Sequence, residues 1–220
     1  MPDFKDRDLI VRYSANQRTN HWIVAITFIL LALSGLALFH PAFYWLTNLF
    51  GGGQWTRILH PWIGVVMFVS FVIFAATMWR SNLMDKRDWQ WVKQSRDVVN
   101  KREDRVPESG KYNGGQKLLY FLQIILLLGL IITGIIMWRQ YFWAFFPIGV
   151  IRVASLLHAF FAFVLICAII IHIYAGLWVK GSVRAMTRGT VTPGWAWKHH
   201  RAWWRSLRDQ RRRSTDTPIE

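Results

Sequence analysis

The sequence has very few residues that could build thiolate chemistry. Only one of its 220 residues is a cysteine, Cys167, which excludes an internal disulfide and an iron–sulfur cluster held by thiolates of this chain alone. No small-residue cleavage site follows the first apolar run, so we expect that run to remain as a helix and not to be removed as a signal peptide. Any redox chemistry in this chain must therefore use other ligands, and Cys167 is interpreted as ordinary packing.

Charge is absent from four long apolar runs. They cover residues 22–39, 61–79, 118–138 and 153–179 and contain no Asp, Glu, Lys or Arg. A helix needs about 20 residues to cross the hydrocarbon core of a bilayer, so each run is long enough to span it. Proton pumps and ion transporters usually keep ionisable groups in mid-membrane, whereas these runs lack all four of the charged residue types. The sequence predicts an all-α integral membrane four-helix bundle that is not built as a pump.

Positive charge is unevenly distributed between the segments that join these runs. Of the 27 Lys and Arg, 24 lie before the first run, between the second and third, or after the fourth. By the positive-inside rule these segments are cytoplasmic and the other two loops face outward. This segregation argues against nucleic-acid binding, the usual alternative for a net charge of +15. We expect a multi-pass protein of the bacterial inner membrane with both termini cytoplasmic.

These expectations divide the chain into three parts. Residues 1–20 form a cytoplasmic N-terminal segment, residues 21–179 form the transmembrane domain with a cytoplasmic loop over 80–116, and residues 180–220 form a basic cytoplasmic tail. The four helices are expected at about 21–39, 61–79, 117–138 and 152–179.

Aromatic residues are concentrated in the segments outside the helices. The tail interleaves tryptophans with cations, so we expect it to lie on the anionic lipids of the inner leaflet. The outward loops carry many aromatic residues and few charges, which favours packing at the outer interface, docking of an outer partner, or both.

Four histidines lie in or at the ends of the apolar runs. His60, expected directly before a first helical turn begun by Pro61, and His158 fall near the outer face and are called the outer pair. His21 and His172 fall near the cytoplasmic face and are called the inner pair. Histidine in hydrocarbon is costly enough to be a functional-site candidate, and imidazole is a standard axial ligand of haem iron. The four histidines are therefore predicted to hold the irons of two stacked haems b.

Helix geometry supports this prediction. His158 and His172 are 14 residues apart, which corresponds to about 21 Å of rise and returns them to within about 40° of one helix face. A flat porphyrin also needs little bulk at position i+4 on the ligand's face. The four residues at i+4 are all small: Ala25, Gly64, Ala162 and Gly176.

The remaining histidines are not expected to bind iron. His40 lies 19 residues after His21, roughly 100° away from its helix face, and is interpreted as an interfacial residue before a proline. His199 and His200 are followed at i+4 by tryptophans. An intramembrane histidine can also make an ordinary hydrogen bond to a neighbouring helix, so the prediction depends on the matched depth and facing of each pair.

The segment 110–117, GKYNGGQK, precedes the third apolar run. Its adjacent glycines allow backbone conformations or a close ligand approach that other residues forbid, and they lie beside the unpaired amides of a helix start. Spacing alone favours a plain turn and helix N-terminal signal.

Several motifs of the chain resemble the gamma subunits, di-haem cytochromes b, of respiratory membrane-bound formate dehydrogenases. The resemblance covers nearly the whole chain, includes the four histidines, and is carried by residues 10–22, 51–61, 110–117 and 178–182.

This resemblance implies a function on the membrane. A periplasmic catalytic subunit containing molybdenum or tungsten would oxidise formate, and an iron–sulfur beta subunit would deliver electrons to the outer haem. Electrons would then pass to the inner haem and reduce menaquinone or ubiquinone near the cytoplasmic face, contributing to the proton-motive force. The resemblance places the quinone beside Asn113, Gly115 and His172, and trimers of the whole complex are possible, as in related complexes.

Two alternatives stay open on the sequence. The same cytochrome could serve a hydrogenase or another periplasmic dehydrogenase, although the segment 110–117 favours formate dehydrogenase. The chain could also be a haemless membrane anchor that holds an outer enzyme through its aromatic loops.

Overall fold

The computed structural model describes residues 8–100, 102 and 105–216. These residues form two compact units. Unit 1 is drawn from Met1–Arg18, Met78–Tyr120 and Ala175–Glu220, and unit 2 consists of Thr19–Thr77 and Phe121–Tyr174.

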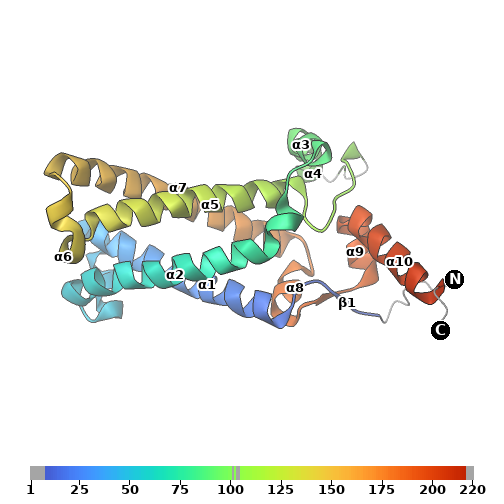
Figure 1. Cartoon of the computed structure of the whole chain (residues 1–220), viewed down its shortest axis with the longest axis horizontal. Helices are drawn as coiled ribbons and strands as arrows, with labels where there is room; N and C mark the ends of the chain where they lie inside the picture. Colours follow the sequence, from blue (N-terminus) through green and yellow to red (C-terminus); the bar gives the residue numbers. More distant parts are fainter. Residues whose placement is uncertain (1–7, 101, 103–104, 217–220) are drawn as a thin grey trace. The chain divides into compact units, whose positions relative to one another are not determined.

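Four long helices dominate the fold (Figure 1). They are α1 (Ala15–Phe39), α2 (Gly53–Asn82), α5 (Gly114–Met137) and α7 (Ile148–Trp178). Each is long and apolar enough to cross a membrane. The prediction of an all-α membrane chain with four spanning helices is confirmed.

Polar capping boxes start two of these helices before their apolar runs begin. At α1, Ser14 Oγ accepts from the Gln17 amide at 3.2 Å while Gln17 Oε1 accepts from the Ser14 amide at 3.1 Å. At α5, Asn113 Oδ1 and Gln116 Oε1 make the same reciprocal bonds, at 2.9 and 3.0 Å. Such boxes satisfy amides that a helix start leaves unpaired. Both helices therefore begin a few residues earlier than hydropathy indicates.

The start of α2 differs from the expectation. Gly51 and Gly52 have φ angles of 84° and 99°, which end the preceding 3-10 helix η1 (Pro41–Phe50). The next helix begins at once at Gly53, and Pro61 lies inside it rather than at its first turn. A proline there removes one helical hydrogen bond. His60 is consequently held within α2, about two turns from its start.

Unit 2 contains most of the four long helices together with their short connections. The connection after α5 consists of α6 (Arg139–Phe142) and the 3-10 helix η3 (Trp143–Phe145). In each apolar window of the long helices, at most 22% of residues are buried by the chain itself. Side chains this apolar need lipid, a bound group or another subunit around them. This exposure agrees with a multi-pass membrane protein.

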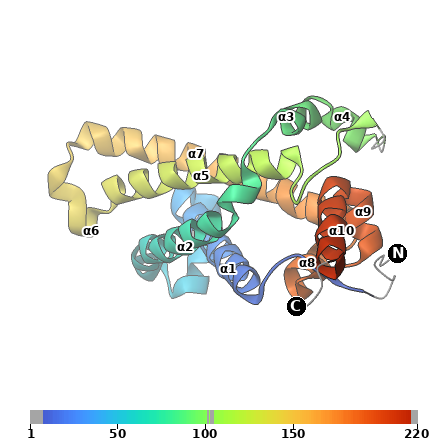
Figure 2. The ribbon, with the colours of Figure 1, turned by 45° about the vertical axis from the view of Figure 1, so that its right-hand side comes forward.

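Unit 1 joins the N-terminal segment to the tail. Strand β1 (Ile10–Val11) pairs antiparallel with β2 (Thr190–Val191). The other elements are α3 (Lys86–Lys93), α4 (Ser95–Val99), α8 (Ser182–Arg188), α9 (Pro193–His199) and α10 (Arg201–Asp216), of which the last three are seen together in Figure 2. A small core of Ile10, Ala185, Val191 and Ala196 holds the strands and tail helices together. The tail expected to lie on lipid thus also has a folded core of its own.

A buried arginine connects three segments of unit 1. Arg12 is only 3% exposed, and its Nη2 donates to the Lys111 carbonyl at 2.7 Å and contacts His200 Nε2 at 3.1 Å. His200 Nδ1 in turn lies 2.8 Å from the Gly110 carbonyl. The guanidinium is also 4.9 Å from the ring centre of Trp195, a distance at which cation–π attraction is effective. The N-terminal segment, the segment before α5 and the tail are thereby tied together.

Acidification should loosen this connection. Burial, and repulsion by the Arg12 guanidinium, lower the pKa of His200 to about 3, against about 6.5 in an unfolded chain. Between these two values the unfolded state binds the extra proton, so stability falls as pH falls, by up to about 1.4 kcal/mol per pH unit. Limited proteolysis of the tail in the membrane-bound protein should therefore speed up between pH 7 and pH 5.

His200→Gln provides the control, because a glutamine side chain can still donate to the Gly110 carbonyl and does not titrate. The tail of this variant should be cleaved at a rate that changes less with pH. An equal pH dependence in both proteins would show that His200 is not the titrating group.

Candidate functional site

The outer pair meets inside unit 2. His60 of α2 and His158 of α7 have ring centres 6.3 Å apart. Ser34 Oγ, on α1, lies 2.7 Å from His60 Nδ1, and Thr133 Oγ1, on α5, lies 2.9 Å from His158 Nδ1. Each imidazole is thus held by a hydroxyl from another helix.

These hydroxyls determine which ring nitrogen carries the proton. Ser34 Oγ donates to the Leu30 carbonyl at 2.7 Å, and Thr133 Oγ1 donates to the Gly129 carbonyl at 2.6 Å. A hydroxyl has only one hydrogen to donate, so toward the imidazole it must accept. Nδ1 of each ring is therefore the protonated nitrogen, and Nε2 keeps a lone pair that can bind a metal ion.

The inner pair also meets in unit 2. His21 of α1 and His172 of α7 have ring centres 6.4 Å apart, and Phe74 packs 5.9 Å from the His21 ring. Among the residues that the structure describes, His21 Nδ1 is buried without a hydrogen-bond partner. Helix α7 therefore contributes one histidine to each pair, as the 14-residue spacing predicts.

Both separations fit two imidazoles on opposite sides of one iron. A bond from a first-row transition metal to an imidazole nitrogen is about 2 Å long. The nitrogen lies about 1 Å from its own ring centre, given ordinary bond lengths. The two ring centres should then be about 6 Å apart, close to the observed 6.3 and 6.4 Å.

Each pair offers two nitrogens and no further ligand. Within the described part of the chain, no three His, Cys, Asp or Glu side chains converge on a common point. Two nitrogens facing each other suit a macrocycle that supplies the other four donors itself, which is how haem iron is bound. The donor set thus fits haem better than a bare metal ion.

Glycines leave space beside the outer rings. A Cβ placed on Gly35 would lie 3.4 Å from His60 Cε1, and one on Gly134 would lie 3.5 Å from His158 Cε1. Each of these glycines follows directly after the hydroxyl residue that bonds the same ring. At Gly176, four residues after His172, a Cβ would meet nothing within 4 Å. Ser34, Thr133 and their glycines were not predicted as site residues, because only their approach to a histidine distinguishes them from other small residues.

The other histidines have different roles. His40 accepts a hydrogen bond from the Ala42 amide at 3.2 Å and caps η1. His200 belongs to the Arg12 network, and the His199 ring packs 5.4 Å from Trp195.

Close packing explains the two adjacent glycines of the segment 110–117, which are the first residues of α5. A Cβ on Gly114 would come within 2.5 Å of the Asp88 carbonyl oxygen, and one on Gly115 within 2.9 Å of the Trp91 ring. These glycines therefore let α3 pack against the start of α5, and neither has a positive φ. Asn113 uses Oδ1 for the helix cap, which leaves its amide Nδ2 outside that bond. Asn113 and Gly115 belong to unit 1, whereas His172 belongs to unit 2.

A buried ion pair holds the same region of unit 1. Lys117 Nζ lies 2.6 Å from Asp88 Oδ2 and donates to the Leu83 carbonyl at 3.0 Å. The same Asp88 oxygen also accepts from the Asp85 amide at 2.8 Å. The start of α5 is thereby fixed to the end of α2 and to α3.

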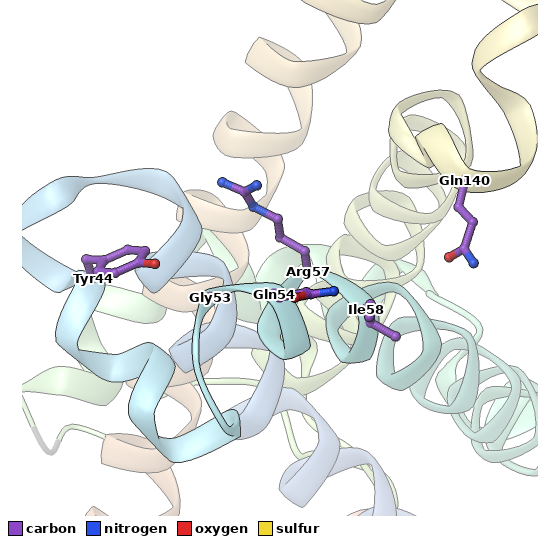
Figure 3. A pocket seen from close by; sticks show the side chains of 6 residues that line it. All are labelled: Tyr44, Gly53, Gln54, Arg57, Ile58 and Gln140. Atoms are coloured by element: carbon purple, nitrogen blue, oxygen red, sulfur yellow. The ribbon is translucent and has the colours of Figure 1, made fainter.

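Unit 2 also has a polar pocket near the start of α2. Its volume is about 510 Å³, and Figure 3 shows Tyr44 and Gln140 on either side of Arg57. The full lining is Tyr44, Gly53, Gln54, Arg57, Ile58 and Gln140. Arg57 precedes His60 by three residues, which places it about one helical turn away. The lining has hydrogen-bond donors and one cation but no carboxylate.

Comparison with known proteins gives a consistent family. Residues 12–189 match the family described as prokaryotic cytochrome b561. The chain is 50% identical over 204 residues to the formate dehydrogenase cytochrome b556(fdo) subunit of Escherichia coli K12, covering 93% of this chain and 96% of that one.

Two further relatives carry similar names. The formate dehydrogenase cytochrome b556 subunit of Haemophilus influenzae is 43% identical over 196 residues, with 89% of this chain and 82% of that one covered. The nitrate-inducible cytochrome b556(Fdn) subunit of Escherichia coli K12 is 41% identical over 199 residues, covering 90% and 92%. These matches confirm the resemblance found in the sequence. The chain therefore belongs to the prokaryotic cytochrome b561 family, together with the cytochrome b556 subunits of formate dehydrogenases.

Proposed function

We propose that this chain is the di-haem cytochrome b subunit of a membrane-bound formate dehydrogenase, and that it carries electrons from an iron–sulfur partner to quinone. Two histidine pairs at haem-iron spacing, both using α7, are the observation that carries this proposal. His60 and His158 are the axial ligands of an outer haem b, and His21 and His172 those of an inner haem b. A bound haem supplies an iron that accepts and releases one electron at a time.

The direction of electron transfer follows from the proposed topology. The positive-inside rule, applied to the basic segments, supports cytoplasmic termini, with the outer pair toward the periplasm and the inner pair toward the cytoplasm. Electrons enter at the outer pair and leave at the inner pair. If quinone takes its protons from the cytoplasm, turnover builds a membrane potential without any proton channel.

The quinone site is proposed at Asn113, Gly115 and His172. Asn113 Nδ2, which the helix cap does not use, is a donor available for a quinone carbonyl. Packing against Trp91 already explains why residue 115 has no side chain. We therefore propose that Gly115 contributes its backbone to the quinone site. Menaquinone and ubiquinone both present the carbonyl that such a donor recognises.

The partners are proposed from the names of the relatives and from the surface of unit 2. Each relative is a subunit of a formate dehydrogenase. On η1 and η3, Tyr44, Trp45 and Phe145 are exposed, and the pocket beside Arg57 adds hydrogen-bond donors. We assign this surface to an iron–sulfur beta subunit, which connects the chain to a catalytic subunit with molybdenum or tungsten. Aromatic side chains of this kind are common anchors in protein interfaces.

The function is tested by the identity of the electron donor. When formate is added to membranes that contain the complete complex, the absorption spectrum of reduced b-type haem should appear. Adding hydrogen should produce no such change. Reduction by hydrogen alone would assign the cytochrome to a hydrogenase. A purified chain without b-type absorption after haem reconstitution would instead indicate a haemless anchor.

A further inference from the structure

Each imidazole of the outer pair contacts one side-chain hydroxyl group. Ser34 on α1 contacts Nδ1 of His60, and Thr133 on α5 contacts Nδ1 of His158, at 2.7 and 2.9 Å. The four residues come from four different helices. Each hydroxyl is followed by a glycine that lies against the same ring. A hydroxyl and the glycine that follows it thus contact the ring on both sides of one pair.

Both contacts are buried and directional. Ser34 is 0% exposed and Thr133 is 5% exposed. Each hydroxyl donates its hydrogen to a carbonyl of its own helix, so the imidazole Nδ1–H is the donor in the contact between them. Such a bond orients the ring and increases the electron density on Nε2.

The inner pair differs in the hydrogen bonding of its rings. His21 Nδ1 has no hydrogen-bond partner among the described residues, although it is buried. Thr27, six residues after His21 on α1, directs its Oγ1 to carbonyls of its own helix, at 2.7 Å from that of Ile23 and 3.1 Å from that of Val24. The outer pair therefore has hydroxyl support on both rings, whereas the inner pair has at least one unsupported ring.

We propose that Ser34 and Thr133 are positioning residues that lower the reduction potential of the outer haem below that of the inner haem. This inference rests on the proposed function. A hydrogen bond donated by Nδ1–H makes imidazole a stronger electron donor, which stabilises ferric over ferrous iron. Electron transfer from the outer to the inner pair is then energetically downhill, which helps it proceed against the membrane potential.

The test is a redox titration of both haems in the complete complex. Ser34→Ala and Thr133→Val each remove one acceptor and should shift the redox equilibrium of the outer haem toward the ferrous form by on the order of tenfold, which is about 59 mV for one electron. The inner haem should keep its potential. Electron paramagnetic resonance should show a change in the low-spin signal of the outer haem only.

Conservative exchanges and a matched control complete the experiment. Ser34→Thr and Thr133→Ser keep the hydroxyl and should restore the original potential. Thr27→Val removes a hydroxyl on α1 that, within the described part of the chain, bonds backbone carbonyls and no histidine, so both potentials should stay unchanged. If Ser34→Ala loses the outer haem while Ser34→Thr keeps it, the hydroxyl is required to hold the ring, which also supports the proposal.

Two results would overturn the inference. Unchanged potentials in both hydroxyl-free variants, at full haem content, would show that the hydroxyls do not tune the outer haem. Loss of the outer haem from Ser34→Thr as well as Ser34→Ala would show that the hydroxyl is not what the site requires. Neither result bears on the proposed function, which fails if the unmodified complex lacks two b-type components or if hydrogen and not formate reduces them.

Discussion

Replacing His158 with alanine should remove the outer haem and stop electron flow from formate to quinone. Among the described residues, His158 is one of two imidazoles at this proposed haem site, facing His60 with ring centres 6.3 Å apart. An iron held by a single histidine loses its low-spin bis-histidine character and is bound more weakly. The variant complex should hold one of its two haems, and its formate-dependent quinone reduction should fall to background. Haem content and a reduced-minus-oxidised spectrum measure the first effect, and an assay of formate-dependent quinone reduction measures the second.

Two further variants make this result specific. His172→Ala should remove the inner haem instead, and formate should still reduce the haem that remains. His40→Ala changes a histidine that caps η1, so it should keep both haems. Retention of two low-spin haems in His158→Ala would contradict the ligand assignment.

Replacing Asn113 with aspartate should abolish quinone reduction while formate still reduces both haems. The aspartate keeps the oxygen that caps α5, because Asp and Asn are comparable N-cap residues. It lacks the amide hydrogen that Asn113 Nδ2 would donate to a quinone carbonyl. Asn113→Ala removes both groups and should additionally cost about 1 kcal/mol of helix stability. Haem reduction kinetics measure electron transfer from formate to the haems, and steady-state assays with a soluble quinone measure quinone reduction. Together they separate the two steps.

Gln116→Ala is the matched control for this prediction. It removes the reciprocal half of the capping box, the bond from the Asn113 amide to Gln116 Oε1 at 3.0 Å, and leaves Asn113 in place. Quinone reduction should persist in this variant. Normal quinone reduction by Asn113→Asp would show that the side-chain amide does not bind the quinone.

Much of the fold could be predicted from the sequence because hydropathy and helix periodicity are local properties. The four apolar runs predicted four spanning helices, and the 14-residue interval between His158 and His172 predicted that α7 would serve both pairs. The helix starts were predicted less well. Polar capping boxes and the glycine pair at Gly51 and Gly52 set them, and hydropathy does not detect either feature.

The candidate site was predicted in its histidines but not in the groups that hold them. Ser34 and Thr133 are ordinary hydroxyl residues of membrane helices until their helices are rotated and offset against α2 and α7. In the same way, the sequence shows only that Gly114 and Gly115 leave room for a ligand or for another segment of this chain. The structure shows that α3 occupies that space.

The sequence by itself determined that the chain has four apolar spans, has a single cysteine and carries four histidines in or at the ends of those spans. These properties depend only on residue type and on rise along a helix. Tertiary structure decided which hydroxyl meets which imidazole, that Arg12 and His200 join the tail to the N-terminal segment, and that Gly114 and Gly115 at the start of α5 serve packing. Such contacts depend on how segments far apart in the chain are placed in space, since no local pattern records the angle and offset between two elements.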